Sequence, residues 1–212
     1  MANNCKLVEE KAALRRDFLG RRAGLATDKR SRAAEELVTA MPQLVAANRG
    51  GIIALYAASE SLHELSLTPL AAALSQVGAP LALPRLTARG ALMEFAAWDG
   101  HRSGLETAAF GLLQPSASAP AVTPSLVLTP GVAFARKDGT RLGMGGGYYD
   151  RALAAFCPLP CIIGVGFAIQ MTDRLPSESH DVKCNALLSE EGLTWISMSS
   201  LSVPAPLAMS VL

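Results

Sequence analysis

The chain lacks a surplus of charge of either sign, and it has few cysteines. Its 19 Lys and Arg residues nearly balance 18 Asp and Glu residues, which gives a formal net charge of +1. A nucleic-acid-binding domain is normally clearly basic, so this balance argues against a nucleic-acid partner. Four cysteines in 212 residues are too few and too scattered for a disulfide scaffold.

Long hydrophobic runs are also missing. Half of the residues are hydrophobic, yet no uninterrupted apolar stretch approaches the ~20 residues that a bilayer crossing needs, so we expect no membrane partner. The first ten residues lack the apolar core of a secretory signal, and the sequence therefore predicts a cytoplasmic protein. Cys157 and Cys161 have no second ligand pair at the spacing of a structural zinc site.

Glycine is concentrated in one segment, residues 140–151. Gly143, Gly145, Gly146 and Gly147 fall within five positions, and such a cluster usually means that something approaches the main chain closely. Residues 149–156 have the pattern of a helix, and a glycine loop that leads into a helix presents unpaired N–H groups to a phosphate. Arg141 can add a bidentate clamp on the same anion. An ordinary strand-to-helix turn explains only one or two of these glycines, so we interpret the segment as a phosphate site.

The loop does not match the common nucleotide motifs. A Walker A loop has Lys-Ser or Lys-Thr after its last glycine, whereas Tyr148 and Tyr149 follow Gly147 here. In the dinucleotide fingerprint Gly-x-Gly-x-x-Gly, counting from Gly143 places Tyr148 at the third glycine position. The residues alone therefore indicate a phosphate site of an unusual type.

Helix-like and strand-like segments alternate along the chain. Helices are expected at residues 6–25, 28–47 with Asp28 as the cap, and 66–78 with Ser66 as the cap. Strands are expected at residues 52–56, 81–83, 92–98, 126–129, 161–165 and 193–196. This pattern predicts a single-domain α/β three-layer sandwich over residues 1–198, with a mostly parallel sheet flanked by helices.

Two segments fall outside that alternation. Residues 114–124 are expected to form a surface loop inside the domain, and residues 199–212, rich in Ser, Ala and Pro, to pack loosely or be disordered. Sites in parallel sheets form beyond the carboxyl ends of the strands, and the glycine loop comes after the strand expected at residues 126–129.

The glycine loop and its surroundings resemble a known family. Thr129-Pro-Gly-Val-Ala-Phe134, followed by Gly139-x-Arg141-Leu-Gly143-x-Gly145-Gly-Gly-Tyr148-Tyr-Asp150-Arg, closely resembles the core of the 5-formyltetrahydrofolate cyclo-ligase family, also called methenyltetrahydrofolate synthetase. The resemblance extends to Lys11-Ala-Ala-Leu-Arg15, Glu64-Leu-Ser-Leu-Thr-Pro-Leu70, Phe110-Gly-Leu-Leu-Gln-Pro115, Gly166-Phe-Ala-x-Gln170, Leu175-Pro176 and His180-Asp181. These segments follow one another in the order that the family has.

The resemblance implies an ATP-dependent enzyme that cyclises 5-formyltetrahydrofolate to 5,10-methenyltetrahydrofolate and releases ADP and phosphate. Its partners are then the folate and Mg-ATP, and we expect a monomer. Phosphoryl transfer asks a protein mainly for positioning and charge neutralisation, which agrees with the lack of a nucleophilic triad in the sequence. The alternatives are a related ATP-dependent ligase or kinase that acts on a different small substrate, and a non-catalytic nucleotide-binding module. Paired metal carboxylates favour an enzyme over the module.

The resemblance also implies a role for each site residue. The residues implied for ATP are Lys11, Arg15, Arg141, Gly143, Met144, Gly145, Gly146, Gly147, Tyr148 and Tyr149. Those implied for the folate are Glu64, Met144, Gly145, Gly146, Gly147 and Tyr148. Arg141 and Tyr148 are the implied catalytic residues, and Asp150 and Asp181 the implied Mg²⁺ ligands, since this ion typically takes one or two carboxylates.

Each role has a plainer alternative. Lys11 and Arg15 project from one helix face, which can be a solvated basic face together with Arg16, Arg21 and Arg22. Asp150 can be a carboxylate that only stabilises a helix start, by ~0.3–1 kcal/mol, and Glu64 a surface charge near a helix start. The chain departs from the family pattern at Ser66, Leu67, Gln114, Ala135, Gly146 and Asn185. Most of these departures fall on the folate side.

Overall fold

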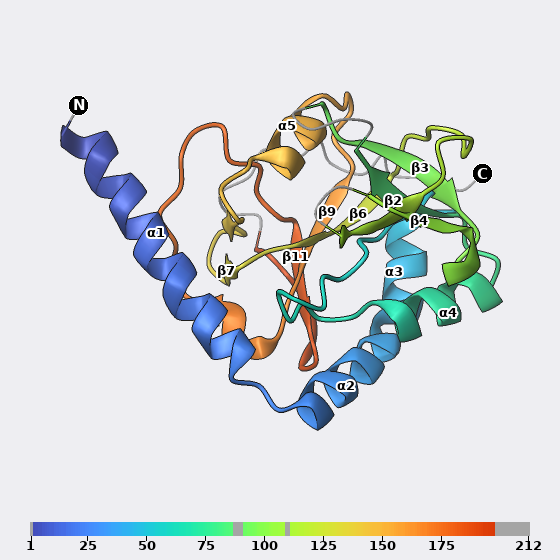
Figure 1. The fold of residues 1–212 in the computed structure, drawn as a ribbon, viewed down its shortest axis with the longest axis horizontal. Helices are drawn as coiled ribbons and strands as arrows, with labels where there is room; N and C mark the ends of the chain where they lie inside the picture. Colours follow the sequence, from blue (N-terminus) through green and yellow to red (C-terminus); the bar gives the residue numbers. More distant parts are fainter. Residues whose placement is uncertain (1, 87–90, 109–110, 198–212) are drawn as a thin grey trace, which may run out of the picture.

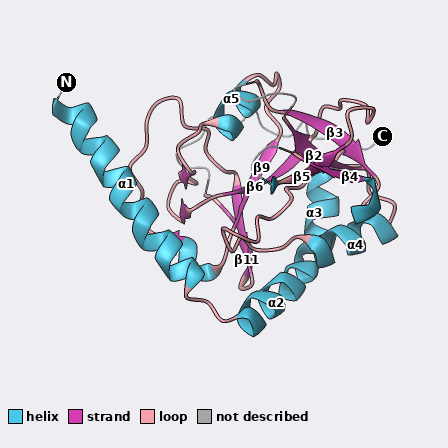
Figure 2. Cartoon of the chain, in the orientation of Figure 1, coloured by secondary structure: helices cyan, strands magenta, loops and turns pink. Residues whose placement is uncertain are grey.

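The computed structural model describes residues 2–86, 91–108 and 111–197. A seven-stranded sheet forms its centre, with strand order β12-β11-β9-β6-β1-β2-β3 (Figures 1 and 2). The strands are β1 (Ile53–Ala54), β2 (Leu81–Arg85), β3 (Glu94–Trp98), β6 (Leu126–Pro130), β9 (Cys161–Val165), β11 (Ala186–Ser189) and β12 (Gly192–Trp195). The five central strands pair in parallel, and β3 and β12 pair antiparallel at the two edges. The predicted α/β fold with a mostly parallel sheet is confirmed.

Helices cover both faces of this sheet. On one face lie α2 (Thr27–Glu36), the 3-10 helix η1 (Leu37–Ala40), α3 (Met41–Asn48) and α4 (Thr68–Gln76), and on the other lies α5 (Tyr148–Ala154). Because successive side chains of a strand point to opposite faces, Leu126 and Leu128 pack with the first group of helices and Val127 packs with Leu153 of α5. All four side chains are fully buried. The layers are therefore helix, sheet and helix.

A smaller sheet and the N-terminal helix complete the molecule. The sheet has the order β10-β7-β8, with β7 (Ala133–Ala135), β8 (Arg141–Leu142) and β10 (Met171–Thr172). The long helix α1 (Ala2–Ala23) lies along one flank of the molecule (Figure 1), where Phe18 packs against Val132, Ala133 and Leu142. The remaining short elements are the hairpin β4 (Leu105–Thr107) and β5 (Leu113–Pro115), η2 (Arg102–Gly104) and η4 (Ala168–Gln170). In the described ranges, no helix is both long and apolar enough to cross a membrane.

Several local expectations were wrong. Helix α2 begins at Thr27 after Ala26, without a side-chain cap, so Asp28 lies inside the first turn instead of capping it. The cap position of α4 is Leu67, and the hydroxyl of Ser66 instead accepts the N–H of Thr68 at 3.2 Å. The glycine loop directly follows β8 of the small sheet, not β6. Phe110 and the tail 199–212 lie outside the described residues.

Candidate active site at the sheet switch point

A cavity lies where the order of the parallel strands reverses direction. The chain runs from β1 to β2 on one side of the sheet and from β6 to β9 on the other, so β1 and β6 are neighbours at the switch point. Open α/β sheets bind ligands in the crevice beyond the carboxyl ends of such strands. A cavity of about 390 Å³ lies there, lined by Tyr56 and Ser59 after β1, Pro84 of β2, and Gly131 after β6. The position agrees with the expectation from the sequence.

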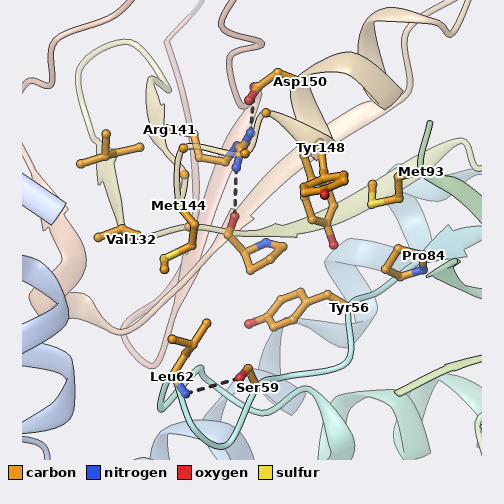
Figure 3. A pocket seen from close by; sticks show the side chains of 18 of the residues that line it. Tyr56, Ser59, Leu62, Pro84, Met93, Val132, Arg141, Met144, Tyr148 and Asp150 are labelled. Atoms are coloured by element: carbon orange, nitrogen blue, oxygen red, sulfur yellow. Dashed lines mark hydrogen bonds and ion pairs between the residues drawn. The ribbon is translucent and has the colours of Figure 1, made fainter. Parts of the chain in front are cut away.

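All the site residues expected from the sequence line this one cavity, although they come from distant parts of the chain. They are Lys11, Arg15, Glu64, Arg141, Gly143, Met144, Gly145, Gly146, Gly147, Tyr148, Tyr149, Asp150 and Asp181. Figure 3 shows Met144 and Val132 on one side of the cavity and Tyr148, Met93 and Pro84 on the other. The site thus has charged groups at the glycine loop and an apolar part beside them.

The side chains of three arginines lie close to the glycine loop. Gly145 has φ +97° and Gly147 has φ +62°, conformations that L side chains rarely adopt. A Cβ at Gly147 would lie 2.9 Å from Nη1 of Arg151, and a Cβ at Gly143 would lie 3.0 Å from Nη1 of Arg141. Arg15 reaches over from α1, and its Nε donates to the carbonyl of Gly143 at 2.8 Å. The positive φ of Gly145 and Gly147 is therefore what requires glycine, since the close contacts involve only the ends of arginine side chains.

Arg141 is a buried cation at the base of the loop. Strand β8 holds its backbone, and its side chain is 4% exposed. Nη2 donates to Oδ1 of Asp150 at 2.8 Å and Nη1 to the carbonyl of Pro130 at 3.3 Å (Figure 3). The Nε–H is buried and finds no acceptor in the part of the chain that the structure describes. A fixed guanidinium with unused N–H donors suits an anion beside the loop.

Lys11 forms a second charged centre with two carboxylates. Its Nζ lies 2.8 Å from both Glu178 Oε2 and Asp181 Oδ2. Burial alone would lower the pKa of Lys11, but the two carboxylates outweigh it and raise that pKa. Burial likewise opposes ionisation of Asp181, yet the hydrogen bonds from Lys11 and from the Glu178 N–H lower its pKa. Both groups are therefore charged at neutral pH.

The first turn of α5, which carries Asp150, meets the loop that carries Asp181. The N–H of Val182, next to Asp181, donates to Oδ1 of Asp150 at 3.4 Å. Ligand atoms of Glu178, His180 and Asp181 lie within 4.8 Å of one another, a group that does not include Asp150. The carboxylate oxygens of Asp150, Glu178 and Asp181 are the kind of ligand that Mg²⁺ prefers, so these three residues fit that ion. The sequence reasoning missed Glu178, although the residue lies close to the His180-Asp181 motif.

The opposite end of the cavity is built around Glu64. Its Oε2 accepts the N–H of Ser59 at 2.9 Å. Burial raises the pKa of Glu64, and this hydrogen bond and the charge of Arg22 partly offset the rise. The hydroxyl of Tyr56, beside it, donates to the carbonyl of Leu65 at 2.7 Å. Glu64 lines the cavity and is partly buried, which favours a role in the site over a simple surface charge.

Arg22 was assigned wrongly from the sequence. Together with Arg16 and Arg21 it was a candidate for a solvated basic face, but it is 2% exposed. Lys11, Arg15, Phe18 and Arg22 follow the spacing i, i+4, i+7, i+11, which places them on one face of α1. That spacing was the signal available in the sequence. The spacing places these residues on one face, but whether that face is buried depends on how α1 packs against the rest of the molecule.

The comparisons with known proteins agree with one another. The model of the 5-formyltetrahydrofolate cyclo-ligase family matches residues 7–190. A 5-formyltetrahydrofolate cyclo-ligase of Haemophilus influenzae is 39% identical over 82 residues, which are 34% of this chain and 41% of that protein. The one of Mycolicibacterium smegmatis is 36% identical over 97 residues, 43% of this chain and 50% of that protein. The matched segments thus span half or less of these two relatives.

A solved structure extends the likeness over the whole domain. The 5,10-methenyltetrahydrofolate synthetase of Aquifex aeolicus has a TM-score of 0.76 and 26% identity, with 94% of this chain and 99% of that chain covered. A 5,10-methenyltetrahydrofolate synthetase from Mycoplasma pneumoniae, at 22% identity and a TM-score of 0.68 over 86% of this chain and 99% of that chain, shares the fold.

Proposed function

The chain belongs to the 5-formyltetrahydrofolate cyclo-ligase family, and from this premise we propose that it converts 5-formyltetrahydrofolate to 5,10-methenyltetrahydrofolate at the expense of ATP. The γ-phosphoryl group passes to the formyl oxygen, the N10 amine attacks the activated carbon, and phosphate leaves with that oxygen. The observation that carries the proposal is one cavity that the glycine loop, Arg141, Lys11 and Glu64 all line. Such a cavity can hold a phosphate donor and a polar heterocycle together.

ATP occupies the charged end of the cavity in this proposal. The backbone N–H groups of residues 143–147 cradle the phosphates, as nests of successive amides do. Arg141 contributes the donor that its Nε leaves over, and Arg15 and Lys11 add positive charge from α1. Because developing phosphate charge is stabilised best by donors that are already fixed, the burial of Arg141 supports a catalytic role for it. Tyr148 and Tyr149, which directly follow the glycine loop, form the cavity wall beside it.

Mg²⁺ accompanies the nucleotide. Asp150 and Asp181 are the residues that would hold it, because both line the cavity and the first turn of α5 meets the loop of Asp181. When bound, the ion supplies neutralisation of phosphate charge. Glu178 is an additional carboxylate at this place, and in the structure it shares Lys11 with Asp181.

The folate occupies the other end. Glu64 accepts hydrogen bonds from N–H groups of the reduced ring. Met144 and Tyr148 offer that ring apolar and aromatic surface beside Gly145, Gly146 and Gly147. The departures from the family pattern on this side keep local contacts. Gln114 accepts the N–H of Leu86 at 3.0 Å, and Asn185 accepts the N–H of Ile162 at 2.8 Å. The monomeric state and the cytoplasmic location stay predictions from the sequence.

One assay tests the proposal. The protein is incubated with 5-formyltetrahydrofolate and Mg-ATP, and methenyl absorbance and ADP are followed together. We expect equal amounts of both products in the wild type and in Arg136→Gln, an exposed arginine outside the cavity. In Glu64→Gln we expect no more than a trace of either product. Binding of ATP without a methenyl product would favour a related ligase or kinase with another substrate.

A further inference from the structure

The ammonium group of Lys11 is bound by carboxylate oxygens that also suit a metal ion. Its Nζ lies 2.8 Å from Oδ2 of Asp181 and 2.8 Å from Oε2 of Glu178. Oδ2 of Asp181 also accepts the backbone N–H of Glu178 at 2.8 Å. Because a carboxylate oxygen offers about two lone pairs, this oxygen is already fully used. A cation that binds Oδ2 must therefore displace Lys11.

This ion pair lies in the cavity wall and is not locked by other groups. Lys11, Glu178 and Asp181 all line the cavity, and among the described residues both hydrogen bonds of the Lys11 side chain go to these two carboxylates. The buried pair of Arg85 and Glu94 is different. It lies outside the cavity, and Arg85 also donates to two backbone carbonyls. The Lys11 pair can therefore open toward a ligand, whereas the Arg85 pair is structural.

The Lys11 side chain can also reach the glycine loop. Arg15 follows four positions later on the same face of α1, and its Nε donates to the carbonyl of Gly143 at 2.8 Å. A Cβ at Gly145 would lie 3.6 Å from Nη2 of Arg15. Side chains four apart on a helix begin only about 5–6 Å from one another, and lysine has a flexible four-carbon stem. A phosphate beside the loop is thus within reach of Lys11 after a rotation of its side chain.

The carboxylates at this end of the cavity already have cation partners. Arg141 holds Asp150 at 2.8 Å, and Lys11 holds the other two, Glu178 and Asp181. Mg²⁺ alone would compete with these cations and would bring no anion to receive a displaced one, which is costly in a largely buried place. The phosphates of ATP are such an anion. Metal and nucleotide are therefore expected to bind better together than apart.

We propose that Lys11 takes the place of the metal in the protein without nucleotide and exchanges partners when Mg-ATP binds. Before the exchange its ammonium neutralises Glu178 and Asp181, and after it the ammonium faces the phosphates while these carboxylates face the metal. Mg²⁺ alone consequently binds weakly, and ATP alone has to draw Lys11 away from its carboxylates. The part that concerns ATP rests on the proposed function.

The first experiment measures the binding of Mg²⁺ alone by titration calorimetry. In Lys11→Met the two carboxylates lose the ammonium that competes with the metal. We expect Mg²⁺ to bind Lys11→Met about tenfold more tightly than the wild type, a typical size for coupling between two bound groups. Mg²⁺ should also raise the unfolding temperature of Lys11→Met more than that of the wild type, because a ligand stabilises the folded state that binds it. An equal or lower affinity in Lys11→Met overturns the proposal.

Lys183→Met is the matched control for this experiment. Lys183 pairs with Asp138 as Lys11 pairs with Asp181, but neither Lys183 nor Asp138 lines the cavity. Its replacement should leave the affinity for Mg²⁺ unchanged. An equal gain of affinity in Lys183→Met would mean that any carboxylate freed from a lysine binds the ion, and this outcome also overturns the proposal.

Glu178→Gln tests the exchange with Lys11 in place, and it covers the case in which Lys11→Met does not fold. The change removes one of the two carboxylates that compete with phosphate for the ammonium. ATP binding in EDTA, without metal, should therefore become about three- to fivefold tighter, the effect of one partly exposed ion pair. Weaker or unchanged ATP binding in Glu178→Gln overturns the proposal.

Glu64→Gln is the control for the charge alone. It removes a carboxylate from the same cavity, but one that accepts the N–H of Ser59 and is not among the hydrogen-bond partners of Lys11 in the described structure. It should leave metal-free ATP binding nearly unchanged, and an equal gain in both variants overturns the exchange. If the wild type binds no ATP while Lys11→Met still gains affinity for Mg²⁺, the proposed function fails and the competition between Lys11 and the metal stands.

Discussion

At the scale of single residues, the cations of the cavity are already paired with its carboxylates. Arg141 holds Asp150, and Lys11 holds Asp181, each at 2.8 Å. The groups proposed to bind phosphate thereby fix those proposed to bind Mg²⁺. Because both pairs are largely buried, removing one partner leaves a charge that the remaining structure cannot solvate. Substitutions here should change activity and stability together.

Arg141→Lys is the sharpest test of the catalytic assignment. Lysine keeps the charge but cannot reach both Asp150 and the carbonyl of Pro130, as the guanidinium does. We expect turnover at saturating substrates to fall by about two to three decades, since the loss of one fixed donor costs ~3–4 kcal/mol in the transition state. Arg136→Lys, at the exposed Arg136–Glu191 pair, is the control and should keep full turnover. Retention of more than about a third of wild-type turnover by Arg141→Lys would contradict the assignment.

The Lys11–Asp181 pair predicts how stability depends on pH. The folded-state pKa of Asp181 is lowered below its usual 3.8, so its contribution is present above that pH and is lost as the pH falls through the folded value. The pKa of Lys11 is raised above 10.5, so its contribution is present below that pH and is lost at higher pH. Lys11→Met should therefore cost about 1–3 kcal/mol near pH 7.

Urea unfolding between pH 2.5 and 8 measures this cost. The difference between wild type and Lys11→Met should stay constant from about pH 5 to 8 and shrink below the usual Asp pKa as Asp181 protonates. Lys6→Met, an exposed lysine on the same helix, is the control and should show no such dependence. A difference that grows at low pH would contradict the charge assignment.

At the scale of elements, the glycine loop is set by backbone shape. Gly145 and Gly78 both have positive φ, at +97° and +73°, but only Gly145 lines the cavity. Each change to alanine should cost about 1–2 kcal/mol from the unfavourable φ. We expect Gly145→Ala also to weaken ATP binding roughly tenfold, because the loop amides lose their fixed arrangement. Calorimetric binding and thermal unfolding separate the two effects, and equal ATP affinity in both variants would argue against the nest.

The same scale explains what the sequence could predict. Six of the seven strands of the large sheet, and helix α1 with its helical period, were predicted within a few residues. Strand β11 (Ala186–Ser189) was missed. Strands β7, β8 and β10 have two or three residues each, which is too short for any period. They place Arg141 on a strand beside α1, and no local pattern announces this.

For the site, too, residues that are close in sequence were predicted, whereas residues whose role depends on distant contacts were not. The glycine loop is local in sequence, and its residues were all found. The environment of Glu178 depends on its contact with Lys11, 167 positions away. That of Arg22 depends on its contact with Gly131, 109 positions away. Contacts of that kind depend on how α1 docks. Without the docked helix, a buried arginine has the same sequence signature as a solvated one.

At the scale of the whole molecule, the cavity joins three parts of the chain. The sheet supplies its base at the switch point between β1 and β6, α1 supplies Lys11 and Arg15 from one flank, and the small sheet supplies Arg141 (Figures 1 and 3). Asp150 lies in the first turn of α5, and Asp181 lies in the loop before β11. The metal proposal therefore depends on tertiary structure.

If Asp150 and Asp181 form one Mg²⁺ site, their substitutions should not behave independently. Asn keeps the size of Asp but removes the charge that a hard cation prefers. Each of Asp150→Asn and Asp181→Asn should raise the Mg²⁺ concentration for half-maximal activity roughly tenfold or more. The double variant should lose much less than the sum of the two single effects. Asp138→Asn is the matched control, since Asp138 is ion-paired with Lys183 away from the cavity. It should lower apo stability without changing the Mg²⁺ requirement. If Asp150→Asn and Asp181→Asn likewise lowered apo stability without changing the Mg²⁺ requirement, the metal assignment would be wrong.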